Sequence, residues 1–196
     1  ECAEVYGVSI AGGDIVASPV FAITVALAGD ARVDEAGRPL LLRRDAAKAG
    51  DLIAVTGPLG GSAGGLRVLQ APTAAELNAG ERDISRRLVE RHMRPRPRVD
   101  AGGFAGRAGL RCGMDISDGL VQDLGHICRA SGIDAELHID DLPLEDGLTA
   151  LFPRDARALA ATGGEDYELL LVGGEGALRS TEDALRKHLD MPDVQQ

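Results

Sequence analysis

The sequence predicts an α+β fold, in which helices cover a mixed sheet. Short apolar runs typical of strands and amphipathic segments typical of helices both occur, but without the regular strand–helix–strand repetition of a parallel α/β fold. Of the 196 residues, 44% are hydrophobic and 27% are charged. That composition is ordinary for a globular chain and sufficient for one or two cores.

A polar, turn-rich loop over residues 31–40 divides the pattern. It follows a β-like run over residues 20–27 and precedes most of the expected elements. We therefore expect residues 1–30 to be the end of one domain and residues 31–196 to form a second, with the boundary within residues 29–41. The first residue is Glu1 and not Met, so we expect the chain to begin inside a longer protein.

Five later segments are expected to be strands, because each is a short apolar run bounded by turn residues. They are "LLLRR", "DLIAVTG", "RCGMDI", "AELHI" and "YELLLVGG".

Helices are expected where apolar residues recur at helical spacing. In "GERDISRRLVERHM" the inner stripe would be Ile84, Leu88 and Met93, and "RPRPRV" then breaks the helix. A helix over residues 118–131 would end at Gly132. The remaining helices are expected after the glycines of "GPLGGSAGGLRVLQ", in a short stretch to residue 108, weakly in "DLPLEDGLTALF", in "DARALAAT" and in "EGALRSTEDALRKHLDMP".

Composition excludes several classes of protein. The net charge is −10 and no basic face is evident, so we expect no nucleic-acid partner. No apolar run reaches the length of a membrane span and no signal peptide is visible, so we expect a cytoplasmic protein without a membrane partner. The three cysteines, Cys2, Cys112 and Cys128, form no CxxC pair, which argues against a disulfide framework or a zinc knuckle.

The stretch "MDISDGLVQDLGHI" gathers carboxylates where a helix begins. Asp115 and Asp118 have two interpretations. Their oxygens would cap the helix and suit its dipole. Alternatively, they would bind a hard cation such as Mg²⁺ beside a phosphate at the helix N-terminus. The stretch alone leaves both open.

Two glycine-rich sites have equally open interpretations. In "AGGD", Gly12 and Gly13 would let the backbone approach a ligand while Asp14 holds a cation, or the stretch is a plain turn. "GPLGGSAGGL" would cradle phosphate or would serve tight turning and close helix packing; it lacks the Lys-Ser/Thr of a P-loop.

In "GGEDYELL", the acids Glu165, Asp166 and Glu168 would cap, bind a cationic substrate or ligate metal, and spacing alone does not separate these roles. No catalytic Ser, Cys or His is evident. Lone His126 is expected at the surface. Several Gly-acid sites without a nucleophile favour electrostatic chemistry through metal, of which phosphoryl transfer is the natural case.

Six motifs occur here in the order found in thiamine-monophosphate kinases, and the chain resembles that family. They are "AGGDIVASP", "KAGDLIAVTGPLGGSAGGL", "RHMRPRPRV", "MDISDGLVQDLGHI", "DDLPL" and "GGEDYELL". The family belongs to the ATP-binding superfamily of aminoimidazole ribonucleotide synthetase and selenophosphate synthetase. The resemblance implies direct transfer of the γ-phosphoryl of ATP to thiamine monophosphate, with Mg²⁺ and without a phosphoenzyme, in a homodimer when full length.

The resemblance also implies roles for individual residues. The implied ATP contacts are Gly13, Asp14, Arg44 and Ser117. The implied Mg²⁺ ligands are Asp14, Asp115 and Asp118. Glu165 is the implied contact to the thiamine substrate, whose thiazolium cation suits a carboxylate.

The chain departs from the family pattern in several places. Ile15 stands where many members have Thr, and Ala46 and Ala49 replace Gly and Pro in the turn "RDAAKAGD". The family's N-terminal acidic motifs and a C-terminal aromatic wall are missing. The resemblance therefore implies that the chain is the end of the first domain and most of the second, incomplete at its C-terminus. The alternatives are a non-catalytic fragment or nucleotide-binding module, or another branch of the superfamily.

Overall fold

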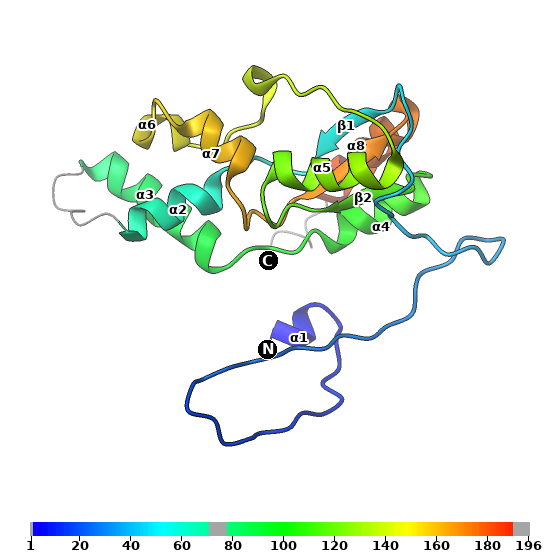
Figure 1. The fold of residues 1–196 in the computed structure, drawn as a ribbon, viewed down its shortest axis with the longest axis horizontal. Coiled ribbons are helices and arrows are strands. Elements are labelled where there is room, and N and C mark those ends of the chain that lie inside the picture. The colour runs from blue at the N-terminus through cyan, green and yellow to red at the C-terminus, as the bar shows by residue number, and fades with distance from the viewer. Residues whose placement is uncertain (1, 71–77, 190–196) are drawn as a thin grey trace. The chain divides into compact units, whose positions relative to one another are not determined.

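The computed structural model describes residues 2–70 and 78–189, and its contacts divide the chain into residues 1–30 and 31–196. We describe each unit by itself. The first contains α1 (Cys2–Val5) and then an open, extended chain, drawn in blue in Figure 1. The run over residues 20–27 forms no strand, contrary to expectation, and Phe21 is 92% exposed. A strand needs a neighbour for its backbone hydrogen bonds, and this unit supplies none among its described residues.

The second unit is built on a three-stranded sheet in the order β1-β3-β2. Its strands are β1 (Leu52–Val55), β2 (Cys112–Asp115) and β3 (Leu169–Gly173), and both pairings are antiparallel. The α+β class is confirmed, but the expectation of a mixed sheet is wrong for the described residues, where parallel pairing is limited to isolated bridges.

Two expected strands do not form. "LLLRR" reaches the sheet only through an isolated bridge between Arg43 and Cys112. "AELHI" lies along the core without a ladder partner and leads into the 3₁₀ turn η1 (Ile139–Asp141). Its Leu137 packs against the core, so burial of an apolar side chain produced the strand-like pattern without strand pairing.

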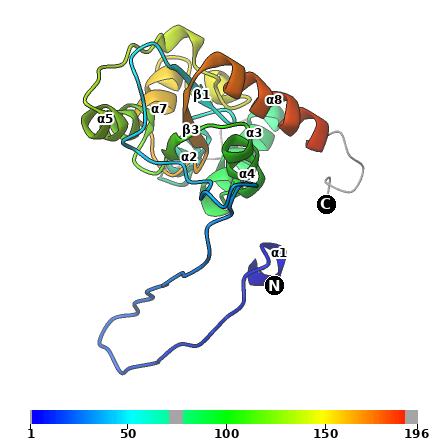
Figure 2. The ribbon, with the colours of Figure 1, turned by 90° about the vertical axis from the view of Figure 1, so that its right-hand side faces the viewer.

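The described part of this unit contains seven helices: α2 (Gly61–Gln70), α3 (Ala79–Met93), α4 (Val99–Arg107), α5 (Leu120–Ser131), α6 (Leu148–Leu151), α7 (Ala156–Thr162) and α8 (Glu175–Leu189). Figure 2 shows α5 and α8 on opposite sides of the strands. No helix among the described residues is both long and apolar enough to cross a membrane.

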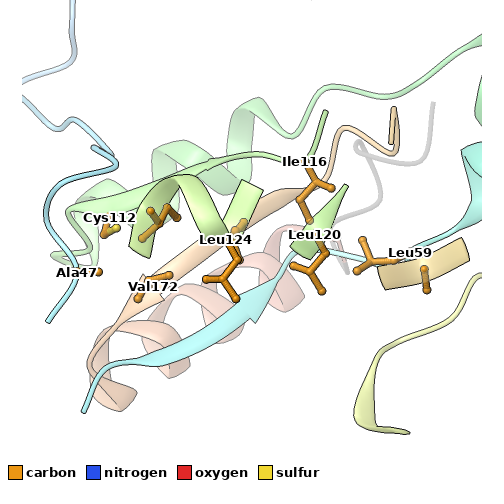
Figure 3. Packing of buried hydrophobic residues seen from close by; sticks show 10 residues of the cluster. Ala47, Leu59, Cys112, Ile116, Leu120, Leu124 and Val172 are labelled. Carbon is orange, nitrogen blue, oxygen red and sulfur yellow. The ribbon is translucent and has the colours of Figure 1, made fainter. Parts of the chain in front are cut away.

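The alternation of β3 explains these two layers. Leu170 and Val172 belong to the largest core cluster, with Leu124 and Ile127 of α5. Leu171 points the other way, into a cluster with α4 and α8. Figure 3 shows side chains of the first cluster gathered between α5 and the strands.

The helix pair α2 and α3 packs closely at one end of the unit. A Cβ at Gly65 would collide with the carbonyl oxygen of Leu88, so the glycines of "SAGGL" serve close helix packing. Leu88 is buried and Ile84 half-buried, as expected, but Met93 is 63% exposed. Its neighbour His92 takes the inward position, where its Nδ1 lies 2.9 Å from the Ser62 Oγ.

Candidate functional site

The loop between β2 and α5 (residues 116–119) is fixed by a single buried carboxylate. The Asp123 side chain, only 1% exposed, accepts hydrogen bonds at Oδ2 from the backbone N–H groups of Ser117, Asp118 and Gly119, at 3.0, 3.0 and 3.1 Å. Helix α5 begins at Leu120. Its N-cap residue is Gly119, at φ +115°, which has no side chain to cap the helix. Asp123 therefore fixes the loop that precedes α5, and neither Asp115 nor Asp118 caps the helix.

Asp115 and Asp118 are left with oxygens that do not serve the helix. Asp115, half-buried at the end of β2, has no side-chain hydrogen bond or ion pair among the described residues. Asp118 is exposed, and its Oδ2 accepts a 3.0 Å hydrogen bond from Gln122 Nε2. Asp115, Ser117 and Asp118 on this loop or its border offer only oxygen donors, which suit a hard cation.

The loop between α7 and β3 (residues 163–168) is hydrogen-bonded to the β2–α5 loop. Three bonds extend the β2–β3 ladder beyond the strands, with N···O distances of 2.8 to 3.0 Å: Ile116 N to Glu168 O, Tyr167 N to Ile116 O, and Glu165 N to Ser117 O. The backbone of Gly164 approaches the Ser117 carbonyl so closely that a Cβ would not fit. Antiparallel pairing thus brings "GGEDYE" alongside "DISDG", although about fifty residues separate them.

Within "GGEDYE" the side chains alternate between solvent and interior. Glu165 and Tyr167 are exposed, and both adopt left-handed backbone conformations, at φ +64° and +52°. Asp166 and Glu168 are buried, at 3% and 0% exposure. The two buried acids anchor the loop and so present the two exposed side chains on one surface.

Asp166 occupies the start of α2. Its Oδ2 accepts the Gly60 N–H at 2.7 Å and its Oδ1 accepts the Ser62 N–H at 3.0 Å. Burial raises the pKa of Asp166, although these two hydrogen bonds oppose the shift. An internal carboxylate therefore takes the N–H groups that a phosphate would need, and "GPLGGSAGGL" is a turn and packing element in this structure.

Glu168 is the centre of a buried ion-pair cluster. Arg98 Nε donates to its Oε2 at 2.8 Å, Arg91 Nη2 donates to its Oε1 at 3.0 Å, and Thr56 Oγ1 donates to its Oε2 at 2.7 Å. Burial alone would raise the pKa of Glu168, but the hydrogen bonds from Arg98, Thr56 and Arg91 outweigh it and lower that pKa. The cluster ties the α7–β3 loop to α3 and to "RPRPRV", a link that sequence reasoning missed.

Asp118, Asp123 and His126 also lie close together, with one potential ligand atom from each within 4.8 Å of the others. Asp123 is already engaged by three backbone N–H groups, and the His126 Nδ1 is 3.0 Å from the Arg129 guanidinium. This group therefore favours fixing the loop over holding a cation.

The remaining residues implied by the resemblance lie elsewhere. Arg44 is exposed on the segment that meets the start of β2, whereas Asp115 is at the other end of that strand. Gly13 and Asp14 belong to the first unit, where both are exposed and Asp14 Oδ1 accepts the Ile15 N–H at 2.8 Å. Asp115, Ser117, Asp118 and Glu165 thus lie on or beside the two paired loops. Arg44 lies near the other end of β2, and Gly13 and Asp14 belong to the first unit.

Comparison with known families agrees with this architecture. The family model "AIR synthase related protein, C-terminal domain" matches residues 48–182, which include the sheet and both loops. The chain belongs to this family. The domain of AIR synthase related proteins is thus the part of the chain that carries Asp115, Ser117, Asp118 and Glu165.

The curated relatives of this chain include thiamine-monophosphate kinases. That of Methanopyrus kandleri is 37% identical over 178 residues, covering 89% of this chain and 53% of the relative. That of Salmonella typhimurium is 42% identical over 166 residues, covering 84% of this chain and 47% of the relative. The resemblance to thiamine-monophosphate kinases is confirmed, and the chain spans about half the length of these relatives.

Solved structures give the same result. The thiamine-monophosphate kinase of Stenotrophomonas maltophilia matches with a TM-score of 0.65 and 41% identity, over 77% of this chain and 48% of that one. A second match, described as AaThiL complexed with AMPPCP and TMP, has a TM-score of 0.61 and 33% identity, over 69% of this chain and 43% of that one. An ATP analogue and TMP are thus ligands of a relative with this domain.

Proposed function

We propose that the chain is the larger part of the second domain, with the end of the first, of a thiamine-monophosphate kinase. In the reaction of such a kinase, an oxygen of the phosphate group of thiamine monophosphate attacks the γ-phosphorus of ATP. The bond from that phosphorus to the β–γ bridging oxygen breaks, giving thiamine diphosphate and ADP. We also propose that the full-length protein works as a homodimer in the cytoplasm, as the resemblance implies.

The proposal rests on the hydrogen-bonded pairing of the β2–α5 loop with the α7–β3 loop. The first loop carries the carboxylates expected to bind metal, and the second carries the carboxylate expected to bind substrate. Asp115 and Asp118 are on the β2–α5 loop or its border, and Glu165 is hydrogen-bonded through its backbone to Ser117 of that loop. Phosphoryl transfer needs two phosphate-bearing reactants held in line, because positioning and charge neutralisation supply most of its catalysis. A relative binds an ATP analogue and TMP, which supports the same assignment.

Asp115 and Asp118 would hold the Mg²⁺ that accompanies the nucleotide. The donor chemistry fits, because the available side-chain atoms are carboxylate and hydroxyl oxygens and Asp115 has no competing partner among the described residues. Bound Mg²⁺ would neutralise charge on the phosphates. Arg44 and Ser117 would contact ATP, and Gly13 and Asp14 of the first unit keep the ATP and Mg²⁺ roles that the resemblance implies for them.

Glu165 would orient the acceptor. Its carboxylate is exposed and lacks a hydrogen-bond or ion-pair partner among the described residues. Thiamine carries a permanent positive charge on its thiazolium ring, so a carboxylate beside the phosphate site would hold that ring while the acceptor phosphate faces ATP. Asp166 and Glu168 are unavailable for this, because both are buried and fully engaged in anchoring the loop.

The test is an assay of the full-length protein with ATP, Mg²⁺ and thiamine monophosphate, following thiamine diphosphate by chromatography. We expect product that depends on all three components. Phosphorylation of another acceptor, or cyclisation of an amidine, in place of thiamine diphosphate would assign the protein to another branch of the superfamily.

The same assay on the 196-residue chain tests the alternative of a non-catalytic fragment. Activity above the blank that is lost in Asp118→Asn would exclude that alternative. Activity only in the full-length protein would show that the fragment needs further ligands.

A further inference from the structure

Asp123 uses only one of its two carboxylate oxygens to fix the β2–α5 loop. Its Oδ2 accepts all three backbone N–H groups, whereas its Oδ1 is buried and has no hydrogen-bond partner among the described residues. A buried carboxylate oxygen without a donor is costly, because burial removes the water that it would otherwise bond. The orphaned Oδ1 therefore needs a donor close by.

His126 lies one turn along α5 from Asp123, and residues three positions apart are neighbours on one face of a helix. A ring nitrogen of His126 lies within 4.8 Å of a carboxylate oxygen of Asp123 and of one of Asp118. The ring is half-buried. A small rotation of the imidazole, or one bridging water molecule, is enough to join the ring to a carboxylate over that distance.

Arg129 fixes which nitrogen of this ring carries the proton. Its Nη2 lies 3.0 Å from the His126 Nδ1. A guanidinium can only donate, so Nδ1 accepts and the proton of the neutral ring is on Nε2. His126 is thus held in the tautomer that donates from Nε2, by a residue that is not part of the β2–α5 loop.

We propose that His126 is a positioning residue of the Mg²⁺ site. Its Nε2–H bonds the Asp123 Oδ1, directly or through one water molecule, and so holds the carboxylate in the rotamer that fixes residues 117–119. The partner is Asp123 and not Asp118, because Asp118 is exposed to solvent and its Oδ2 already accepts a hydrogen bond from Gln122. The inference rests on the proposed function, in which Asp118 on this loop binds the metal, and His126 acts on that loop only through Asp123.

The experiment compares three single variants of the full-length protein. His126→Ala removes the donor. His126→Gln keeps one, because the side-chain amide nitrogen of Gln reaches about as far as Nε2 of the ring. His138→Ala is the control, since the His138 side chain is 70% exposed and lies outside both loops. Hydrogen–deuterium exchange of the peptide spanning residues 116–120 is measured by mass spectrometry without nucleotide or Mg²⁺, and the Mg²⁺ dependence of the rate is measured separately.

We expect this peptide to exchange about tenfold faster or more in His126→Ala, because the loop N–H groups open more often. Exchange should stay within about twofold of wild type in His126→Gln and be unchanged in His138→Ala. The Mg²⁺ concentration for half-maximal rate should rise about tenfold in His126→Ala, the scale seen when a group that orients a metal site is lost. The KM for thiamine monophosphate should not change.

A double variant separates action through Asp123 from direct contact with the metal. In an Asp123→Ala background, His126→Ala should add less than about twofold to the Mg²⁺ requirement, because both changes remove the same bond. A full tenfold addition would overturn the proposal, as would wild-type exchange in His126→Ala or equally fast exchange in His126→Gln. The exchange measurement needs no catalysis, so failure of the wild type to make thiamine diphosphate would overturn the proposed function alone.

Discussion

Glu165 donates its backbone N–H to the carbonyl oxygen of Ser117 over 2.8 Å. This bond joins the segment that carries an unpaired, solvent-facing carboxylate to the loop between Asp115 and Asp118. Two parts of the chain that would hold different reactants are therefore one hydrogen-bonded unit, and their relative position is set by the β2–β3 pairing.

Changing Asp115 or Asp118 to Asn should raise the Mg²⁺ concentration needed for half-maximal rate several-fold and lower the rate. Asn keeps a neutral oxygen but loses the charge that the cation needs. The free energy of unfolding should change by less than about 0.5 kcal/mol, because neither carboxylate caps α5. Kinetics of the full-length protein against Mg²⁺ measure the effect, with Asp183→Asn on the exposed face of α8 as control. Wild-type kinetics at low Mg²⁺ in both variants would rule out their role as ligands.

Asp123→Ala should act differently from Asp118→Asn, because it frees three backbone N–H groups at once. We expect the free energy of unfolding to fall by about 1–3 kcal/mol, the cost of buried donors left without partners. The Mg²⁺ requirement should also rise, since the loop that carries Asp118 is no longer fixed. Urea denaturation and Mg²⁺ titration together check this prediction; a normal Mg²⁺ requirement would show that the loop keeps its shape without Asp123.

Glu168→Gln should destabilise the fold by about 3 kcal/mol or more, because Arg98 loses its buried counter-charge and Arg91 keeps only its ion pair with Glu145. Glu165→Gln is the matched control in the same loop, and its unfolding free energy should stay within about 0.5 kcal/mol of wild type. Equal losses of stability in the two variants would contradict the assignment of Glu168 as a buried anchor of the loop and of Glu165 as an exposed side chain without a structural role.

The contribution of Glu168 should depend on pH. Its pKa in the folded state lies below the ordinary value of 4.5, so the unfolded chain takes up the proton first as the pH falls. The stability it supplies is present above about pH 4.5 and is lost as the pH drops through the folded-state pKa. The difference in unfolding free energy between wild type and Glu168→Gln should therefore shrink from pH 6 to pH 3. A constant difference would show that folding does not lower the pKa of Glu168.

Gly65→Ala and Gly176→Ala should have opposite effects. A methyl group at Gly65 would meet the backbone of α3, whereas nothing lies within 4 Å of a Cβ at Gly176 on α8. We expect Gly65→Ala to lower the unfolding free energy by about 1–3 kcal/mol. Gly176→Ala should raise it by up to about 1 kcal/mol, since Ala favours helix. Thermal denaturation of both proteins is sufficient, and equal stability would refute the close packing of α2 on α3.

The sequence predicted long amphipathic elements and buried strands well, because their patterns follow from burial. The strand in "ELLLVGG" formed as β3, and the expected final helix formed as α8 over residues 175–189, while its last expected residues, 190–192, lie outside the described residues. The run over residues 20–27 and "AELHI" had the composition of strands but no partner, and pairing is a property of the fold that a local pattern does not contain.

The roles given to the candidate site residues stay predictions. Motif order pointed to Asp115, Asp118 and Glu165, and the structure placed them around one pair of loops. The roles of Asp166 and Glu168 were not predictable, because both bond to groups that only folding brings near. Glu168, for example, meets Thr56 across 112 positions of sequence.

The most direct test of the paired-loop account is the affinity of the Glu165→Gln variant for each reactant, measured by calorimetry on the full-length protein. The account predicts that thiamine monophosphate binding weakens by about 1–3 kcal/mol, the scale of a lost charged contact, while ATP binding is unchanged. An equal loss for both ligands, or a collapse of the melting temperature, would mean that Glu165 supports the fold and does not contact the acceptor.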